Sequence, residues 1–179
     1  MVMKNLSKLF VVFALVFLGV NTTRAQRSLK DDEANKAAEV KDLISSGRYT
    51  FEATKVISQK GNSSSLVPGY DLDVSKDTLI VNLPASARTA TMNPGGKGIQ
   101  LTCTNFGYNV SAGKNGHQEI TILPKEKNSG GMKEIRKLKL DVSSLGYTTL
   151  TITGSGSPVS YYGYIKGHSA EFPPVSAQQ

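Results

Sequence analysis

The stretch that decides the fold runs from Leu145 to Ile165 and reads LGYTTLTITGSGSPVSYYGYI. In its first half, Thr148, Leu150 and Ile152 alternate with the threonines between them. This period of two is typical of a strand that buries one face. Glycine, serine and proline residues follow at 154–158 and interrupt strand pairing, and three tyrosines stand at 161–164. The stretch therefore predicts a β-hairpin, whose second strand is rich in tyrosine.

Residues 1–25 have the pattern of a signal peptide. Two lysines precede an apolar run of 12 residues from Leu9 to Val20, and small residues stand three and one positions before Gln26. The run is shorter than the about 20 residues that a membrane-spanning helix needs. We therefore predict an exported chain that is cleaved between Ala25 and Gln26, has no membrane span afterwards, and is soluble in the periplasm or outside the cell.

Charge and cysteine content narrow the classes of function. The net charge of the whole chain is +7, but three of its cations fall within residues 1–25 together with no acids. The remaining charge of +4 is too mild to predict a nucleic acid as partner. The single cysteine, Cys103, is in phase with Ile99 and Leu101, so we expect a small buried hydrophobe rather than a catalytic thiol. The length after cleavage predicts one domain, and we expect a monomer.

The segment 26–47 predicts a helical lead-in. Acidic residues at its start suit the positive end of a helix dipole, and Gly47 is a natural stop. A narrow apolar stripe cannot support a lone helix in water, so we expect the helix to pack on a sheet. The stripe consists of Ala37, Val40, Leu43 and Ile44.

From residue 48 to 166 the pattern changes to short alternating segments separated by turn residues. The segment 61–65 is expected to be a loop, and the phase of the first strand is lost near Val56, where a bulge is predicted. Because the connections are short, we predict an antiparallel meander of 8–10 strands that curls into a half-barrel or barrel. The expected fold is α+β and mostly β, with one N-terminal helix on a curved sheet and a loose tail at 167–179.

The pair Gly-Tyr occurs at 69–70, 107–108, 146–147 and 163–164. One explanation is a hairpin unit that is used three times. The other is that unrelated hairpins use the same turn chemistry.

Histidine content argues against the commonest catalytic and metal sites. His117 and His168 are the only histidines, so His-based zinc sites are excluded unless carboxylates supply the other ligands, and both rings are expected to face water. No metal or cofactor is predicted. Asp71 and Asp73 share a strand face and are expected to face solvent, although paired carboxylates could bind Ca²⁺ or act as glycosidase acid and base.

The basic cluster of Lys133, Arg136, Lys137 and Lys139 is expected to be a solvated strand face, with an anionic partner as the alternative.

The tyrosines supply the candidate binding surface. Successive side chains of a strand point to opposite faces, so Tyr161 opposes Tyr162 and Tyr164, and one set is expected to face solvent. Exposed aromatic rings can stack on sugars or anchor a protein partner, whereas packing across strands is the structural alternative. The candidate surface consists of Tyr147, Tyr161, Tyr162, Tyr164 and Arg88.

Several motifs together resemble the exported bacterial family filed as domain of unknown function 4251. They are GYDL-x-VS-x-D at 69–77, Leu83-Pro84 with Arg88, Gly98-Ile99, GY-x-x-L at 146–150 and SYYG-x-I at 160–165. The resemblance covers most of the chain after residue 25. It implies an envelope-associated protein of Gram-negative gut bacteria with no assigned activity.

Three functions remain open. We expect a non-enzymatic exported domain that binds an envelope glycan, a peptide or a small ligand held between helix and sheet. A hydrolase is the second hypothesis, acting through Asp71 and Asp73 with a carboxyl of raised pKa in a cleft, or through a catalytic triad that the sequence does not show. A protein inhibitor that presents a flat aromatic patch to a secreted enzyme is the third.

Overall fold

The computed structural model describes residues 30–57, 61–84, 98–125 and 135–168. Four sequence predictions lie outside these residues: the signal peptide with its cleavage site, Arg88, Lys133, and the tail beyond residue 168. By its internal contacts the chain divides into two units, residues 1–38 and 39–179. The helix at residues 30–46 crosses this boundary. Among the described residues, no helix combines the length and apolarity needed to cross a membrane.

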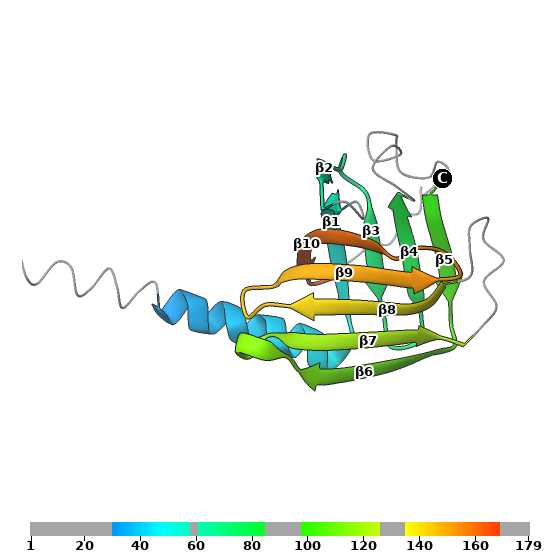
Figure 1. Cartoon of the computed structure of the whole chain (residues 1–179). Coiled ribbons are helices and arrows are strands. Elements are labelled where there is room, and N and C mark those ends of the chain that lie inside the picture. Colours follow the sequence, from blue (N-terminus) through cyan, green and yellow to red (C-terminus); the bar gives the residue numbers. More distant parts are fainter. Residues whose placement is uncertain (1–29, 58–60, 85–97, 126–134, 169–179) are drawn as a thin grey trace, which may run out of the picture. The chain divides into compact units, whose positions relative to one another are not determined.

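The second unit begins with helical residues 39–46 and continues into ten strands (Figure 1). One turn of 3₁₀ helix, η1 (Lys114–Gly116), links the sixth and seventh strands. The strands are β1 (Tyr49–Ile57), β2 (Ser63–Ser65), β3 (Asp71–Val74), β4 (Leu79–Pro84), β5 (Gly98–Cys103), β6 (Phe106–Ala112), β7 (Gln118–Pro124), β8 (Ile135–Val142), β9 (Tyr147–Gly154) and β10 (Val159–Lys166).

All strand pairs are antiparallel, and the strand order is β5-β4-β3-β1-β10-β9-β8-β7-β6, with β2 attached to β1. The predicted fold is confirmed: a mostly β domain with an N-terminal helix and a curled, nearly closed antiparallel sheet. The meander is joined between its first and last long strands, β1 and β10, and is open between β5 and β6, which are consecutive in sequence. The hairpin predicted at 145–165 is the β9–β10 pair.

Two local predictions differ from the structure. The predicted loop at 61–65 contains β2, because its serines pair with the second half of β1. The register of β1 against β10 shifts between Ala53 and Lys55, so the bulge lies slightly before the position predicted near Val56. Sequence alternation could not locate either feature, since both depend on which strand lies alongside.

The inner face of the sheet forms the core. It is built from alternate, fully buried side chains of the strands, and Cys103 lies among them as predicted. The helical residues Val40 and Ile44 of the second unit are buried in the same cluster. Tyr108 of β6 donates a hydrogen bond from its hydroxyl to the carbonyl oxygen of Ile44, at 3.0 Å. The helix ends at Gly47, whose positive φ of 62° is a backbone conformation that glycine adopts at little cost.

Candidate functional site

Three tyrosines gather on the outer face of β9 and β10. Tyr147 is 56% exposed, Tyr162 is 40% exposed and Tyr164 is 37% exposed. Tyr164 lies directly opposite Tyr147 in the β9–β10 pair, and Tyr162 is two residues along the same strand on the same face. We call these three residues the outer tyrosine surface. The sequence predicted all three as binding residues, and the strand pairing places them side by side.

Tyr161 belongs to the core and not to this surface. Its side chain is fully buried on the inner face, and its hydroxyl donates a hydrogen bond to the carbonyl oxygen of Pro84 at 2.6 Å. Burial raises the pKa of Tyr161 well above its usual range. Its inclusion in the predicted surface was therefore wrong, because residue alternation sends it to the face opposite Tyr162.

Gly163, between Tyr162 and Tyr164, allows β10 to approach β1 closely. A Cβ at this position would overlap the carbonyl oxygen of Glu52 and lie 3.0 Å from the ring of Phe51. The glycine of the sequence Tyr-Tyr-Gly-Tyr is thus required by packing on the inner side of the strand. The two tyrosines beside it are held on a strand that the core fixes in place.

Charged residues continue the outer face from the tyrosines toward β3. Glu52 of β1 lies opposite Tyr164 on one side and opposite Asp71 on the other, so Asp71, Glu52, Tyr164 and Tyr147 form one row across four strands. Lys166 donates to a carboxylate oxygen of Glu52 at 2.6 Å. This hydrogen bond lowers the pKa of Glu52 and raises the pKa of Lys166.

Asp71 is the one carboxyl of this row with a raised pKa. Partial burial is the main cause, and the negative charges of Asp73 and Glu52 add to it, while Lys166 acts in the opposite direction. A carboxyl with a raised pKa is what the hydrolase hypothesis expected. The Asp71 carboxyl lies on the outer face of the sheet, however. Its predicted companion Asp73 is hydrogen-bonded to Thr50 and contacts His168.

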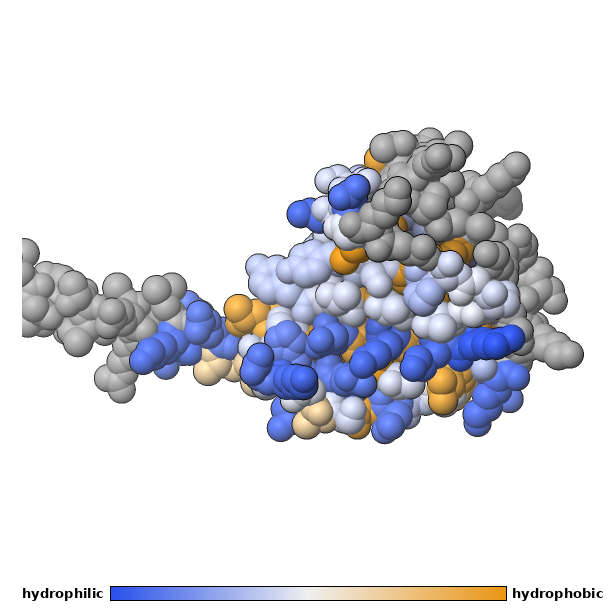
Figure 2. Space-filling model, in the orientation of Figure 1, coloured by the Kyte–Doolittle hydropathy of each residue, from blue (hydrophilic) through white to orange (hydrophobic). Residues whose placement is uncertain are grey.

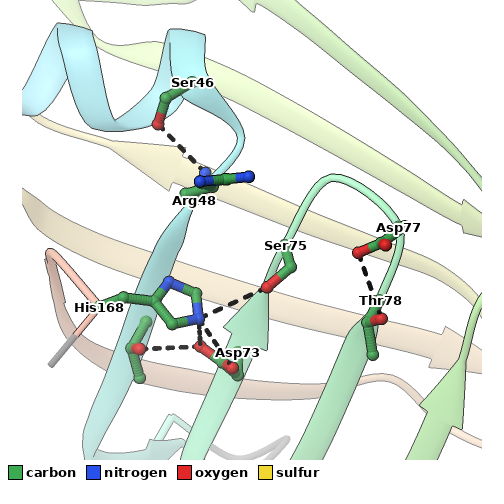
Figure 3. A network of polar contacts seen from close by, with 8 residues as sticks. Ser46, Arg48, Asp73, Ser75, Asp77, Thr78 and His168 are labelled. Atoms are coloured by element: carbon green, nitrogen blue, oxygen red, sulfur yellow. Dashed lines mark hydrogen bonds and ion pairs between the residues drawn. The ribbon is translucent and has the colours of Figure 1, made fainter. Parts of the chain in front are cut away.

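Asp73 belongs to a separate polar network (Figure 3). It accepts a hydrogen bond from the hydroxyl of Thr50 at 2.9 Å and contacts Nε2 of His168 at 2.8 Å. The hydroxyl of Ser75 lies 3.5 Å from the same Nε2 atom. A catalytic triad needs the aspartate and the serine on different nitrogens of the imidazole, so this arrangement is not a triad.

The two histidines lie on the surface, as the sequence predicted, and both contact aspartates, which it did not predict. His117 lies 2.7 Å from a carboxylate oxygen of Asp141 on the neighbouring strand. Within the described residues, no group of three or more His, Cys, Asp or Glu residues could hold a metal ion.

A hydrophilic band covers the outer face over β7 and β8 (Figure 2). It contains cations of the predicted basic cluster, but acids are interleaved with them. Lys139 pairs with Glu119 of β7 at 2.9 Å, and Asp141 stands two residues further along β8. Charges of both signs make this band a poor match for a polyanion.

Sequence reasoning missed Glu52 and Lys166 as members of the site. They are 114 residues apart in the chain and meet only because β1 pairs with β10. The alternation of β1 indicated that Glu52 faces outward, but nothing in the sequence indicated which strand would be its neighbour.

Comparison with known proteins identifies a family that this chain matches. A family model described as "Domain of unknown function (DUF4251)" matches residues 31–165. A crystal structure of a DUF4251 family protein from Bacteroides eggerthii DSM 20697 has a similar fold, with a TM-score of 0.56 and 13% sequence identity, over 75% of this chain and 89% of that chain. At this identity the likeness extends to the fold alone. No match was found among curated proteins.

Proposed function

This chain belongs to the DUF4251 family, a family of unknown function, and on that premise we propose that it is an exported, non-enzymatic binding domain for a cell-envelope glycan. The observation that carries the proposal is the outer tyrosine surface: three exposed aromatic rings on one face of the sheet. Tyrosine has an apolar ring and a polar hydroxyl, so it can stack on the C–H face of a sugar while its hydroxyl bonds to the sugar's oxygens.

The residues beside the tyrosines complete a surface suited to sugar hydroxyls. The Glu52–Lys166 pair offers both an acceptor and a donor next to Tyr164. Because the two charges neutralise each other, the surface favours a neutral or weakly charged ligand. Asp71, at the end of the row, supplies a further carboxyl that is only partly solvated.

The extent of the surface matches a short glycan. From the exposed fractions of the three rings, their accessible area is on the order of 300 Å². A stable protein–protein interface needs about 800 Å² on each partner. Three rings of this area can cover a short oligosaccharide, whereas a protein partner would also have to bury the residues around them.

The interior is less suited to a ligand. The space between the helix and the sheet is occupied by the buried side chains of Val40, Ile44 and Tyr49, with Tyr108 bridging to the helix end. This packing supports a surface site rather than a small molecule held between helix and sheet. The engagement of Asp73 by Thr50 and His168 likewise weighs against a hydrolytic pair.

Calorimetric titration of the purified protein with oligosaccharides released from peptidoglycan and from lipopolysaccharide tests the proposal. We expect binding to one of these glycans, and a loss of affinity of about tenfold or more in a variant that carries Tyr147→Ala and Tyr164→Ala, because two stacking contacts are removed. Leu123→Ala is the matched control, since Leu123 is a similarly exposed residue (45%) on the outer face of β7. Equal affinity in the double variant and the control would refute the site.

Export is tested separately. We expect cell fractionation to find the protein outside the cytoplasm, and mass spectrometry to find that its mature form begins at Gln26. A mature protein that retains residues 1–25 would contradict the predicted cleavage.

A further inference from the structure

The strand β6 (Phe106–Ala112) stands at one end of the strand order, and among the described residues it pairs only with β7. Two backbone hydrogen bonds show which residues of β6 direct their N–H and C=O groups toward β7. Gly113 donates to the carbonyl oxygen of His117 at 2.9 Å, just beyond one end of the pair. Lys125 donates to the carbonyl oxygen of Asn105 at 2.9 Å, just beyond the other end.

In an antiparallel pair, hydrogen-bonded residues alternate with residues whose backbone groups point away from the partner strand. Because Asn105 and Gly113 are bonded toward β7 and the register between them is continuous, the odd-numbered residues of β6 face β7. The even-numbered residues therefore direct their N–H and C=O groups to the open edge. These residues are Phe106, Tyr108, Val110 and Ala112.

This edge lacks the features that usually prevent strands from pairing with other chains. Natural edge strands are short, bulged, or carry charged residues or proline. β6 is seven residues long, has no bulge against β7, and its sequence FGYNVSA contains neither a charge nor a proline. Asn109 to Ala112 are exposed, and Val110 presents an apolar side chain that is 38% exposed.

We propose that β6 pairs antiparallel with β6 of a second copy of this chain, around a two-fold axis at Asn109. In this register Phe106 pairs with the partner's Ala112, and Tyr108 pairs with the partner's Val110. All four outward-facing residues of each copy then become hydrogen-bonded pairs, so no open-edge N–H or C=O of β6 is left over. The sequence alone suggested a monomer, because its composition does not reveal which strand lies at the edge.

A second copy suits this edge better than a charged peptide does. The strand is neutral, so its pairing brings no like charges of β6 against each other, and the residues available for pairing are symmetric about Asn109. The resulting interface joins two sheets into one continuous sheet and forms an isologous contact, as closed dimers require. β6 is separated from β9 by β7 and β8, so the proposed dimer leaves the outer tyrosine surface accessible.

Sedimentation velocity over a range of concentrations, on the purified protein, tests the proposal. We expect the native protein to dimerise as its concentration rises to about 1 mM. In the proposed register Asn109 faces its own copy across the axis, so Asn109→Lys or Asn109→Glu places like charges opposite each other and weakens the dimer about fivefold or more. An equimolar mixture of the two variants is expected to recover a heterodimer, because opposite charges then meet.

A second variant tests the edge without relying on charge. The N–H of Val110 points away from β7, so Val110→Pro keeps the β6–β7 pairing and removes a donor from the dimer. We expect it to weaken dimerisation about tenfold while the thermal unfolding midpoint of the monomer changes little. Ser63→Lys is the control and leaves dimerisation unchanged, because Ser63 is an exposed residue of β2, which pairs with β1 and not with β6 or β7. A native protein that stays monomeric, or variants of residues 109 and 110 that dimerise as the native protein does, would overturn the proposal. Glycan binding is measured independently, so either proposal can fail alone.

Discussion

The tyrosines on the two faces of β10 are one residue apart in sequence and differ completely in environment. Tyr161 is fully buried and its hydroxyl is bound to the carbonyl oxygen of Pro84, whereas Tyr162 is 40% exposed. A buried hydroxyl without a partner costs about 1–3 kcal/mol, so the inner position requires a matched acceptor. The outer position has no such requirement. The comparison indicates that stability constrains Tyr161, whereas Tyr162 carries no such constraint and is available for recognition.

The largest expected difference between the two faces is in stability. Tyr161→Ala should lower the free energy of unfolding by about 4 kcal/mol, because it leaves a cavity and an unpaired carbonyl oxygen at Pro84. Tyr162→Ala should lower it by less than about 1 kcal/mol, since the side chain is already partly in water. Urea denaturation followed by circular dichroism measures both values. Similar losses in the two variants would break the distinction between the faces.

A smaller effect is expected at Gly163, which separates Tyr162 from Tyr164. Gly163→Ala should lower the free energy of unfolding by about 2–3 kcal/mol, because the new Cβ overlaps the Glu52 carbonyl oxygen and forces β10 away from β1. Gly107→Ala in β6 is the control. A Cβ there lies 3.7 Å from the nearest atom, an ordinary contact, so its stability should match the native protein within about 0.5 kcal/mol. Denaturant titration of both variants tests whether packing alone explains this glycine.

The smallest expected effects on the free energy of unfolding concern Glu52 and Asp71, the two carboxyls in the row that crosses β3, β1, β10 and β9. These two effects have opposite signs. The folded-state pKa of Glu52 is lowered, so its ion pair contributes stability above its ordinary pKa, and that stability is lost as the pH falls through the folded-state pKa. Glu52→Gln should therefore cost about 0.5 kcal/mol at neutral pH and nothing in strong acid.

Asp71 behaves in the reverse sense. Its folded-state pKa is raised, so folding favours the protonated form, and ionisation destabilises the protein as the pH rises above the ordinary pKa of about 4. Asp71→Asn should stabilise the protein by a few tenths of a kcal/mol at neutral pH, with the gain disappearing below about pH 4. Thermal unfolding midpoints of both variants between acid and neutral pH measure the two trends. If both substitutions shifted the unfolding midpoint in the same direction at neutral pH, the opposite pKa shifts of Glu52 and Asp71 would be contradicted.

Sequence patterns predicted the fold to a large extent, because strand alternation and turn residues are local. The hairpin at 145–165, the buried Cys103 and the stop at Gly47 all follow from residues within a few positions of one another. The same alternation predicted that Tyr162 and Tyr164 share a face. It did not indicate which face is buried, so Tyr161 could not be separated from them with certainty.

The pairing of distant strands was decided only by the tertiary structure. Glu52 contacts Lys166, and Asp73 contacts His168. β6 becomes an edge because β1 joins β10, while β5 and β6 stand at the two ends of the strand order and do not pair with each other. The sequence by itself determined the alternation of each strand and the positions of most turns, since these depend on local sterics and side-chain polarity. Which strands become neighbours depends instead on how the whole chain buries its apolar faces together, and no single segment carries that information.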